Sequence, residues 1–366
     1  MESIITVNVK NNRPYDVVIT DNFKSLGERL LSLYEKERKL CIIADKNVYD
    51  IYGEELKKEL KNSFETVDSI SLELGEENKS LATVSKCYSF MTEHRYDRKD
   101  AVIALGGGIC GDVAGFIAAT YMRGIGFVQI PTTLLSMVDS SSGGKTGVNF
   151  EDYKNMIGSF KMPHLVYVNI SVLKTLDARE YASGMAEVLK AGLIRDGVFY
   201  EWLINNFPFI NDRDTEYVSE MIEKSVTIKK FYVEKDPLEL NERAILNFGH
   251  TTGHALEKYT GFKYNHGECV ALGSVVAAFI SYKKGFLSDD EYYEIRDMFV
   301  PFGLPISLED IDIDRVVEYM KSDKKNSSGR LRFILLKKIG KGIISEDVSY
   351  DDVKEALEEI NFKSGE

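Results

Sequence analysis

The chain has 366 residues, 44% of them hydrophobic and 28% charged, a composition typical of a folded protein large enough for two domains. Its formal net charge of −12 argues against a nucleic-acid partner, because polyphosphate binding needs a basic surface. The amino terminus MESIITVNVK has no signal-peptide pattern, and the longest apolar stretch, residues 270–282, is too short to span a bilayer, so we expect no membrane partner.

Short β-type runs alternate with amphipathic helical patterns over roughly the first 170 residues. After a hairpin expected at 3–9 with 15–20, strands are expected at 39–45, 67–74, 100–107 and 126–133, and helices at 48–62 and 81–94. This alternation predicts βαβ units and an α/β domain with a Rossmann-like parallel sheet.

Helical periodicity dominates after about residue 175, with little alternation until RLRFILL at 330–336. We therefore expect an NAD-binding α/β domain at 1–172 and a mainly α-helical domain, binding metal and substrate, at 173–366. The cleft between two such domains is the expected place for an active site.

The four cysteines lie far apart and form no CxxC motif; they are Cys41, Cys87, Cys110 and Cys269. This spacing predicts reduced, mostly buried thiols in a cytoplasmic protein.

A glycine turn, LGGGICGD at 105–112, follows one expected strand and opens a helical run. Gly106, Gly108 and Gly111 fit G-x-G-x-x-G, in which glycines let the backbone approach a phosphate at a helix start. No acidic residue ends a strand about twenty positions later, as it would in a dinucleotide fingerprint. Asp45, at the end of an earlier strand, could instead hold an adenosine ribose. The alternative is that the glycines only permit tight packing.

A polar, glycine-containing stretch at 132–149 ends in SSSGGKTGVN. It is similar to a P-loop but lacks the required glycine at 139, which rejects a nucleotide triphosphatase. Lys145 on the glycine turn and Lys154 and Asn155 nearby suit an anionic group. An ordinary solvated loop with incidental lysines is the alternative.

Three of the five histidines, His250, His254 and His266, fall within seventeen positions. His250 and His254 are four apart on an expected helix, which places them on one face about 6 Å apart. Two helical histidines and a third donor commonly hold zinc, and Glu187 or Glu268 could add an oxygen ligand. Histidines at the surface or satisfied within a core are the alternative.

Seven segments in order resemble the 3-dehydroquinate synthase family, of the sugar-phosphate cyclase superfamily, along nearly the whole chain. They are GGGICGDVAGFIAATYMRG, IPTTLLSMVDSSSGGKTGVN, KNMIGSF, SGMAEVLK, LNFGHTTGHALE, NHGE and DKKNSSGRLRFILL. The resemblance implies a lyase of the shikimate pathway that converts 3-deoxy-D-arabino-heptulosonate 7-phosphate to 3-dehydroquinate and phosphate. The implied steps are transient oxidation by NAD, phosphate elimination, re-reduction, ring opening and aldol closure. The implied cofactors are NAD and Zn²⁺ or Co²⁺.

The resemblance also implies roles for individual residues. The metal ligands fall on Glu187, His250 and His266, and His254 handles substrate and protons, which replaces the His250–His254 pair that spacing alone favours. The residues implied to contact the substrate phosphate are Lys145, Asn155, His254 and, from the neighbouring subunit of a homodimer, Arg123. The other implied catalytic residues are Asp139, Lys190, Lys229, Arg243 and Asn247, with either Lys324 or Lys325 on the substrate carboxylate. The implied NAD contacts are Asp45, Glu76, Lys79, Gly107, Gly108, Asp112, Thr132, Thr133, Lys145 and Lys154.

Three other functions compete with this interpretation. A polyol or glycerol-type dehydrogenase would share NAD and the metal but would release NADH. A cyclase acting on another sugar phosphate would differ only in its pocket. A non-catalytic NAD-binding regulator would have no use for the full set of lysines, histidines and the glutamate.

Overall fold

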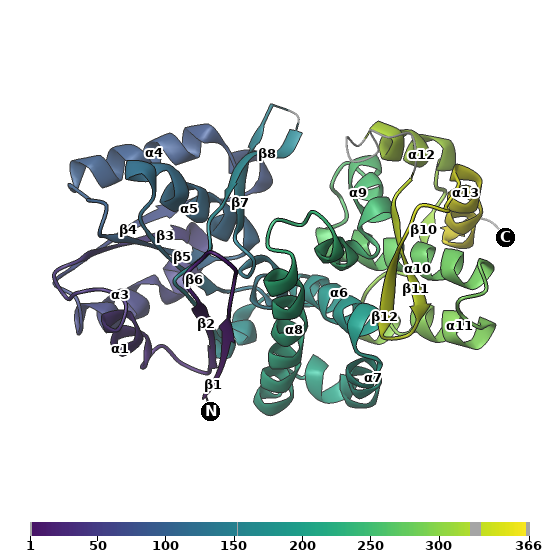
Figure 1. Ribbon diagram of the computed structural model, residues 1–366, viewed down its shortest axis with the longest axis horizontal. Helices are drawn as coiled ribbons and strands as arrows, with labels where there is room; N and C mark the ends of the chain where they lie inside the picture. Colours follow the sequence, from purple (N-terminus) through teal and green to yellow (C-terminus); the bar gives the residue numbers. More distant parts are fainter. Residues whose placement is uncertain (1, 152, 323–330, 364–366) are drawn as a thin grey trace. The chain divides into compact units, whose positions relative to one another are not determined.

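The computed structural model describes residues 2–151, 153–322 and 331–363. The chain forms two compact units, drawn in Figure 1: residues up to Leu176 with Val218–Leu238, and Asp177–Tyr217 with the residues from Glu239 onward. Most of helix α8 (Thr215–Lys235) thus packs with the first unit. The division expected from the sequence, an NAD-binding domain at 1–172 and a metal- and substrate-binding domain at 173–366, assigns a function to each part and stays a prediction.

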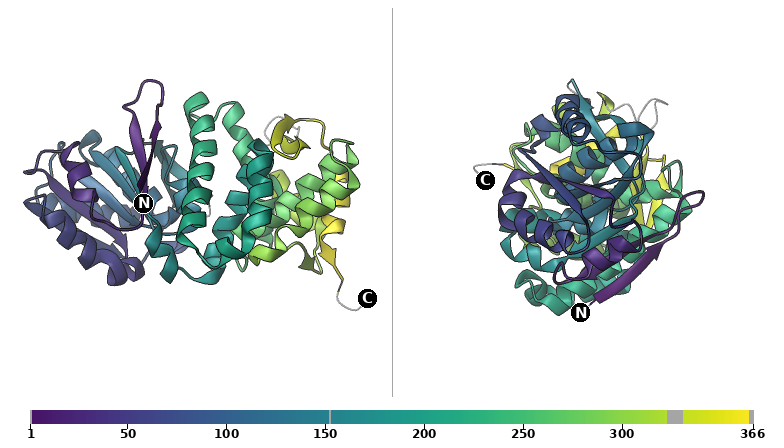
Figure 2. Two further views of the ribbon diagram at one scale, coloured as in Figure 1. Left: turned by 90° about the horizontal axis from the view of Figure 1, so that it is seen from below. Right: turned by 90° about the vertical axis from the view of Figure 1, so that its left-hand side faces the viewer.

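The first unit is built on a seven-stranded sheet with the order β1-β2-β9-β6-β5-β3-β4. Its strands are β1 (Glu2–Val7), β2 (Tyr15–Thr20), β3 (Lys39–Asp45), β4 (Thr66–Leu72), β5 (Ala101–Gly106), β6 (Gly126–Pro131) and β9 (Leu165–Asn169). Every neighbouring pair is parallel except the β1–β2 hairpin, purple in Figure 2. The expected hairpin and mostly parallel sheet are confirmed. Strands β5 and β9 are buried along their whole length, as continuous apolar runs require.

Helices cover both faces of this sheet, with α4 and α5 on one side and α1 and α3 on the other (Figure 1). Their bounds are α1 (Leu26–Leu31), α2 (Lys46–Val48), α3 (Glu54–Lys61), α4 (Leu81–Glu93) and α5 (Gly108–Thr120). Cys87 and Met91 of α4 and Ile117 of α5 pack with the β3, β5 and β6 side chains in one apolar cluster. This core fixes the strand ends that carry the polar residues described below.

The stretch expected as a polar loop at 132–149 is more ordered than predicted. Residues Ser136–Ser140 form a π-helical turn, and β7 (Lys145–Phe150) pairs antiparallel with β8 (Tyr153–Phe160). A Cβ at Gly147 would lie 2.8 Å from the Ile157 carbonyl oxygen, and one at Gly158 would lie 2.4 Å from that of Thr146. Glycines therefore permit this close pairing and at the same time remove the apolar alternation that identifies a strand.

The second unit is mainly helical, as expected, with two short strand pairs. Its elements are α6 (Ala178–Arg195), α7 (Gly197–Asn211), α9 (His250–Tyr259), α10 (His266–Lys283), β10 (Leu308–Glu309), α11 (Asp289–Asp297), α12 (Ile313–Ser322), β11 (Phe333–Lys338), β12 (Lys341–Ser345), α13 (Tyr350–Glu359) and β13 (Asn361–Phe362). Helix α10 is buried along most of its length and contacts α6, α9, α11, α13 and β11. It is the central helix of this unit.

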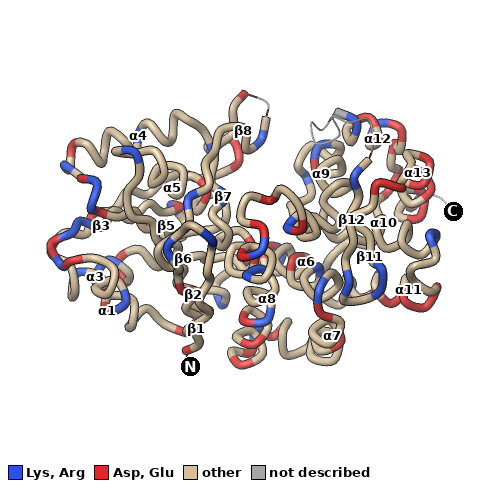
Figure 3. The backbone as a smooth tube through the Cα atoms, viewed as in Figure 1, with Lys and Arg blue, Asp and Glu red and all other residues tan. Residues whose placement is uncertain are grey.

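Acidic residues are frequent on α11 and α13, which carry red stretches in Figure 3. All four cysteines are free and buried, which confirms the expectation of reduced, buried thiols. Within the described ranges, no helix is long and apolar enough to pass through a membrane.

Candidate active site

The glycine turn joins β5 to α5 at the carboxyl end of the sheet. Gly107 caps the helix with an extended backbone, and a Cβ at Gly108 would lie 3.0 Å from the Ser140 hydroxyl oxygen. At Gly111 a Cβ would lie 2.7 Å from Gln129, so this glycine serves close packing. The packing interpretation is therefore supported at Gly111, while a phosphate at the start of α5, beside Gly107 and Gly108, stays a prediction.

Two hydroxyls near this turn are buried without a hydrogen-bond partner in the described part of the chain. They are Oγ1 of Thr132, directly after β6, and Oγ of Ser140. Buried hydroxyls are normally satisfied, so an unsatisfied pair beside a helix start fits a polar ligand. Thr133 differs, because its hydroxyl lies 2.9 Å from that of Ser136.

Acidic residues follow the two strands on one side of β5. Asp45 ends β3, the immediate neighbour of β5, and accepts the Asn47 and Val48 N–H groups at 3.0 and 3.4 Å. Glu76, after β4, accepts the Asn149 amide at 2.8 Å, and Lys154 lies 3.9 Å from the same carboxylate. The sheet topology therefore places both acids at the same edge as the glycine turn.

Lys79 is a buried cation that joins two other predicted site residues. It is only 4% exposed, and its ammonium donates to the carboxylate of Asp112 and the side-chain oxygen of Asn155. Asn155 itself has a positive φ of 53°, a conformation asparagine tolerates better than most residues. A buried cation of this kind needs such partners.

A second buried ammonium, that of Lys229 on α8, lies 2.7 Å from Asp139. Asp139 belongs to the π-helical turn that precedes β7, so a helix and a loop ninety positions apart meet at this pair.

The metal-type cluster lies in the second unit. Oε1 of Glu187, on α6, is 3.5 Å from Nε2 of His250 and 3.4 Å from Nε2 of His266. One ligand atom from each residue lies within 4.8 Å of the other two. His250 and His266 are the first residues of α9 and α10, so three helices bring these donors to one point.

Both ligand-type histidines turn the same ring nitrogen toward Glu187. Nδ1 of His250 donates to the Phe248 carbonyl at 3.0 Å, and Nδ1 of His266 donates to Glu257 at 2.6 Å. Burial lowers the pKa of His250 well below its ordinary value. Burial also lowers the pKa of His266, but its hydrogen bonds to Glu187 and Glu257 outweigh burial and raise the pKa to about 10. A metal ion would therefore have to displace a proton from His266.

His254 lies beside this cluster. Its ring centroid is 5.4 Å from that of His250 and 6.1 Å from that of His266. It groups with Glu257 and His266 rather than with Glu187, so the described residues offer no three-donor set that includes both His250 and His254.

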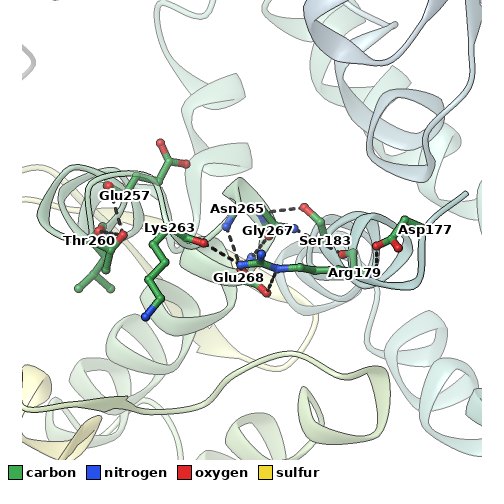
Figure 4. A network of polar contacts seen from close by, with 10 residues as sticks. Asp177, Arg179, Ser183, Glu257, Thr260, Lys263, Asn265, Gly267 and Glu268 are labelled. Atoms are coloured by element: carbon green, nitrogen blue, oxygen red, sulfur yellow. Dashed lines mark hydrogen bonds and ion pairs between the residues drawn. The ribbon is translucent and has the colours of Figure 1, made fainter. Parts of the chain in front are cut away.

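Glu268, the other carboxylate considered as a ligand, has a structural role instead. It accepts two hydrogen bonds from Arg179 at 2.7 and 2.6 Å, and it completes a capping box with Asn265 at the start of α10 (Figure 4). The Gly267 N–H donates to the Ser183 hydroxyl of α6 at 3.0 Å. These contacts fix the start of α10, and with it His266, against α6.

The other predicted site residues of this unit lie close in sequence to Glu187 or to His250. The buried Lys190 forms an ion pair with Glu187 one turn away on α6. Arg243 is 1% exposed, and Glu239 joins it to Asn247, accepting from the Asn247 amide at 2.8 Å. The segment that carries Arg243 and Asn247 leads directly into His250.

Other predicted residues take more exposed positions. Lys145, at the start of β7, is exposed, as is Arg123, which follows Met122 in a turn where both have positive φ. Lys324 and Lys325 lie outside the described residues.

Reasoning from the sequence missed Glu257 and Glu239. Glu257 could have been found, because it shares a helical face with His250 and His254 at the spacing i, i+4, i+7. Glu239 lies in a loop and has no local signal.

Family models and curated relatives that match this chain point to one family. The family model "3-dehydroquinate synthase N-terminal" matches residues 69–183, and "3-dehydroquinate synthase C-terminal" matches residues 184–326. The 3-dehydroquinate synthase of Ruminiclostridium cellulolyticum is 43% identical over 92% of this chain and 93% of its own length. That of Rippkaea orientalis is 41% identical over 98% of both chains.

A solved structure extends this similarity to the fold. The 2-epi-5-epi-valiolone synthase of Streptomyces hygroscopicus is 26% identical with a TM-score of 0.86, over 97% of this chain and 98% of its own. The chain therefore belongs to the 3-dehydroquinate synthase family, within the sugar-phosphate cyclase superfamily. Its activity is that of a 3-dehydroquinate synthase, a phosphate-eliminating carbon–oxygen lyase of the shikimate pathway.

Proposed function

We propose that the chain performs this activity on 3-deoxy-D-arabino-heptulosonate 7-phosphate, with NAD and a divalent metal ion, Zn²⁺ or Co²⁺, as cofactors. The observation that carries the proposal is the convergence of Glu187, His250 and His266 on one point. The structure of the related valiolone synthase contains bound NAD⁺ and Zn²⁺, which supports the same pair of cofactors here.

The donor set fits a catalytic metal. One carboxylate and two imidazoles are a common zinc ligand set that leaves a position for substrate. Nδ1 of each histidine is held by an acceptor, the Phe248 carbonyl or Glu257, so Nε2 is directed at Glu187. Hydrogen bonds of this kind orient ligand histidines in metal proteins. Glu187, His250 and His266 would hold the ion.

The strand ends of the first unit fit a dinucleotide. Gly107 and Gly108 carry no side chain at the start of α5, and the Thr132 and Ser140 hydroxyls beside it are buried without a partner in the described chain. Asp45 at the end of β3 suits a ribose, because its carboxylate can accept from hydroxyls. The other residues proposed to contact NAD are Glu76, Lys79, Asp112, Thr133, Lys145 and Lys154.

When bound, NAD would remove and return the hydride at carbon 5 of the substrate, and the metal ion would polarise the substrate hydroxyls. The residues of this chain would hold the substrate for these steps. Lys145, Asn155 and His254 would bind the phosphate, which can itself accept the carbon 6 proton as it leaves. The other pocket residues would be Asp139, Lys190, Lys229, Arg243 and Asn247.

We further propose a cytoplasmic homodimer in which Arg123 reaches the phosphate site of the neighbouring subunit. Arg123 is exposed, and positive φ angles at Met122 and Arg123 hold its turn in a conformation unfavourable for these residues. Backbone strain of this kind is retained mainly where function requires it.

Chelation tests the metal part of the proposal. Protein treated with a chelator and freed of it should show no release of phosphate from the substrate, and added Zn²⁺ or Co²⁺ should restore it. Turnover at the full rate by a preparation shown to be metal-free would overturn the proposal.

A further inference from the structure

Glu257 makes a contact that the proposed ligand set and reaction do not use. Its Oε1 lies 2.6 Å from Nδ1 of His266, and its side chain is 9% exposed. The other nitrogen of the same ring, Nε2, lies 3.4 Å from Glu187. The His266 ring is therefore held between two carboxylates, one on each nitrogen.

We propose that Glu257 is a positioning residue that sets the affinity of the Glu187–His250–His266 centre for its metal ion. A carboxylate on Nδ1–H fixes the tautomer and the ring orientation, so that Nε2 is left for the metal, and it raises the basicity of that nitrogen. The inference rests on the proposed metal centre and concerns the hydrogen bond that orients one of its ligands, His266.

The two ligand histidines are supported unequally. His250 donates from Nδ1 to a neutral backbone carbonyl, that of Phe248, at 3.0 Å. His266 donates to a carboxylate at a shorter distance, and hydrogen bonds to ionised acceptors are roughly twice as strong as neutral ones. A side-chain substitution can remove the Glu257 acceptor of His266, but it cannot remove the backbone carbonyl of Phe248 that accepts from His250.

The helix geometry explains how Glu257 reaches His266. Helix α9 begins with His250 and places Glu257 two turns later on the same face, so one helix supplies one ligand and supports another. A Cβ at Gly253 would lie 2.9 Å from the Cys269 carbonyl oxygen, so this glycine lets α9 approach α10 closely. The approach brings Glu257 within reach of the first residue of α10.

A direct ligand role for Glu257 is the competing interpretation, because His254, Glu257 and His266 also lie within 4.8 Å of one another. That role would use Nδ1 of His266, the nitrogen already bonded to Glu257, and would leave Nε2 facing Glu187 without the ion. Shared orientation of His250 and His266 toward Glu187 favours the positioning role.

The test compares Glu257→Gln and Glu257→Leu with wild type in chelated protein titrated with Zn²⁺ and Co²⁺. Gln keeps an oxygen acceptor without charge, and Leu removes the acceptor, so we expect the metal Kd to rise in the order wild type, Gln, Leu. The rise in the Leu variant should be about 10- to 100-fold. Glu291→Gln is the matched control: Glu291 caps α11 and contacts no histidine of the cluster. Its metal Kd should equal that of wild type.

Two further measurements separate the roles. The Co²⁺ absorption spectrum should keep its shape in both Glu257 variants, while the His266 Nδ1–H proton resonance of the Zn²⁺ form should shift. A changed Co²⁺ spectrum would make Glu257 a ligand and overturn the inference, as would a Kd within twofold of wild type in both folded variants. If Leu prevents folding, the Gln variant decides alone. Failure of wild type to bind metal through Glu187, shown with Glu187→Ala, would instead reject the metal centre itself.

Discussion

The ammonium of Lys229 lies 2.7 Å from the carboxylate of Asp139, although ninety positions separate them. Lys229 is 8% exposed, and the Asp139 side chain is 27% exposed, so the pair joins α8 to the loop before β7 with the ammonium buried. The pair is one of the contacts, with that of the Asn8 N–H to Glu234 at 2.7 Å, between residues 218–238 and the rest of the first unit.

Removing one member of this pair should destabilise the protein. Lys229→Met removes the buried ammonium that contacts Asp139, and we expect a loss of about 1–3 kcal/mol in the free energy of unfolding, measured by urea denaturation. Lys224→Met, on the same helix, breaks a more exposed pair with Glu220 and should cost less than about 0.5 kcal/mol. Equal losses in the two variants would show that burial of the Lys229 pair is unimportant.

His254 and His250 should differ sharply when each is replaced by alanine. His254→Ala should slow phosphate release and keep the bound metal, because Glu187, His250 and His266 remain. His250→Ala should lose the metal. Metal content by elemental analysis checks both, and loss of metal from the His254 variant would support the ligand pair suggested by spacing.

Gly267 should tolerate no side chain. A Cβ there would lie 2.1 Å from the Ser183 carbonyl oxygen, a backbone atom of α6 that cannot move independently of its helix. Gly267→Ala should therefore lower the free energy of unfolding by about 1–3 kcal/mol and weaken metal binding, because His266 is the neighbouring residue. Gly197→Ala, whose nearest contact is 3.4 Å, is the matched control and should be close to neutral in both measurements. A stable Gly267→Ala variant with wild-type metal affinity would contradict this packing.

His164 should make the protein less stable in mild acid. Burial lowers its pKa to about 4, and its Nδ1 lies 2.6 Å from the Tyr34 hydroxyl. The unfolded chain therefore binds a proton on this ring at a higher pH than the folded chain does, and stability falls as the pH falls from about 6.5 toward about 4. The contribution lost by pH 5 should be about 2 kcal/mol.

Denaturation curves at pH 7 and pH 5 measure this loss. His164→Phe cannot take up the proton, so the difference in unfolding free energy between the two pH values should be smaller in the variant by that amount. An unchanged difference would mean that the pKa of His164 is the same in the folded and the unfolded protein.

The sequence predicts best what depends on neighbours along the chain. The buried runs at β3, β5 and β6 are largely apolar, and those at β3 and β5 end in Asp45 and Gly106. The amphipathic pattern at 81–94 likewise predicts α4. Strands β7 and β8 were missed because Gly147 and Gly158, which let them pair, leave no apolar pattern. Strand β9 was not expected either, since its five residues are too few to separate from a buried turn.

The same distinction between local patterns and distant contacts applies to the candidate site. The glycine turn and the histidine cluster stand out locally, but only the three-dimensional structure shows that Glu187 meets His250 and His266 while Glu268 turns to Arg179. Spacing favoured His250 with His254, because helical neighbours are visible in sequence and contacts between helices are not. The proposed site between two domains stays a prediction.

The most direct test of the account is phosphate release from 3-deoxy-D-arabino-heptulosonate 7-phosphate by the purified protein with Zn²⁺ and NAD at a concentration far below the substrate. We predict many phosphates released per NAD, 3-dehydroquinate as the product, and no accumulation of NADH absorbance. Stoichiometric NADH without phosphate would contradict the account and indicate a dehydrogenase. No phosphate release from metal- and NAD-loaded protein would contradict the proposed substrate.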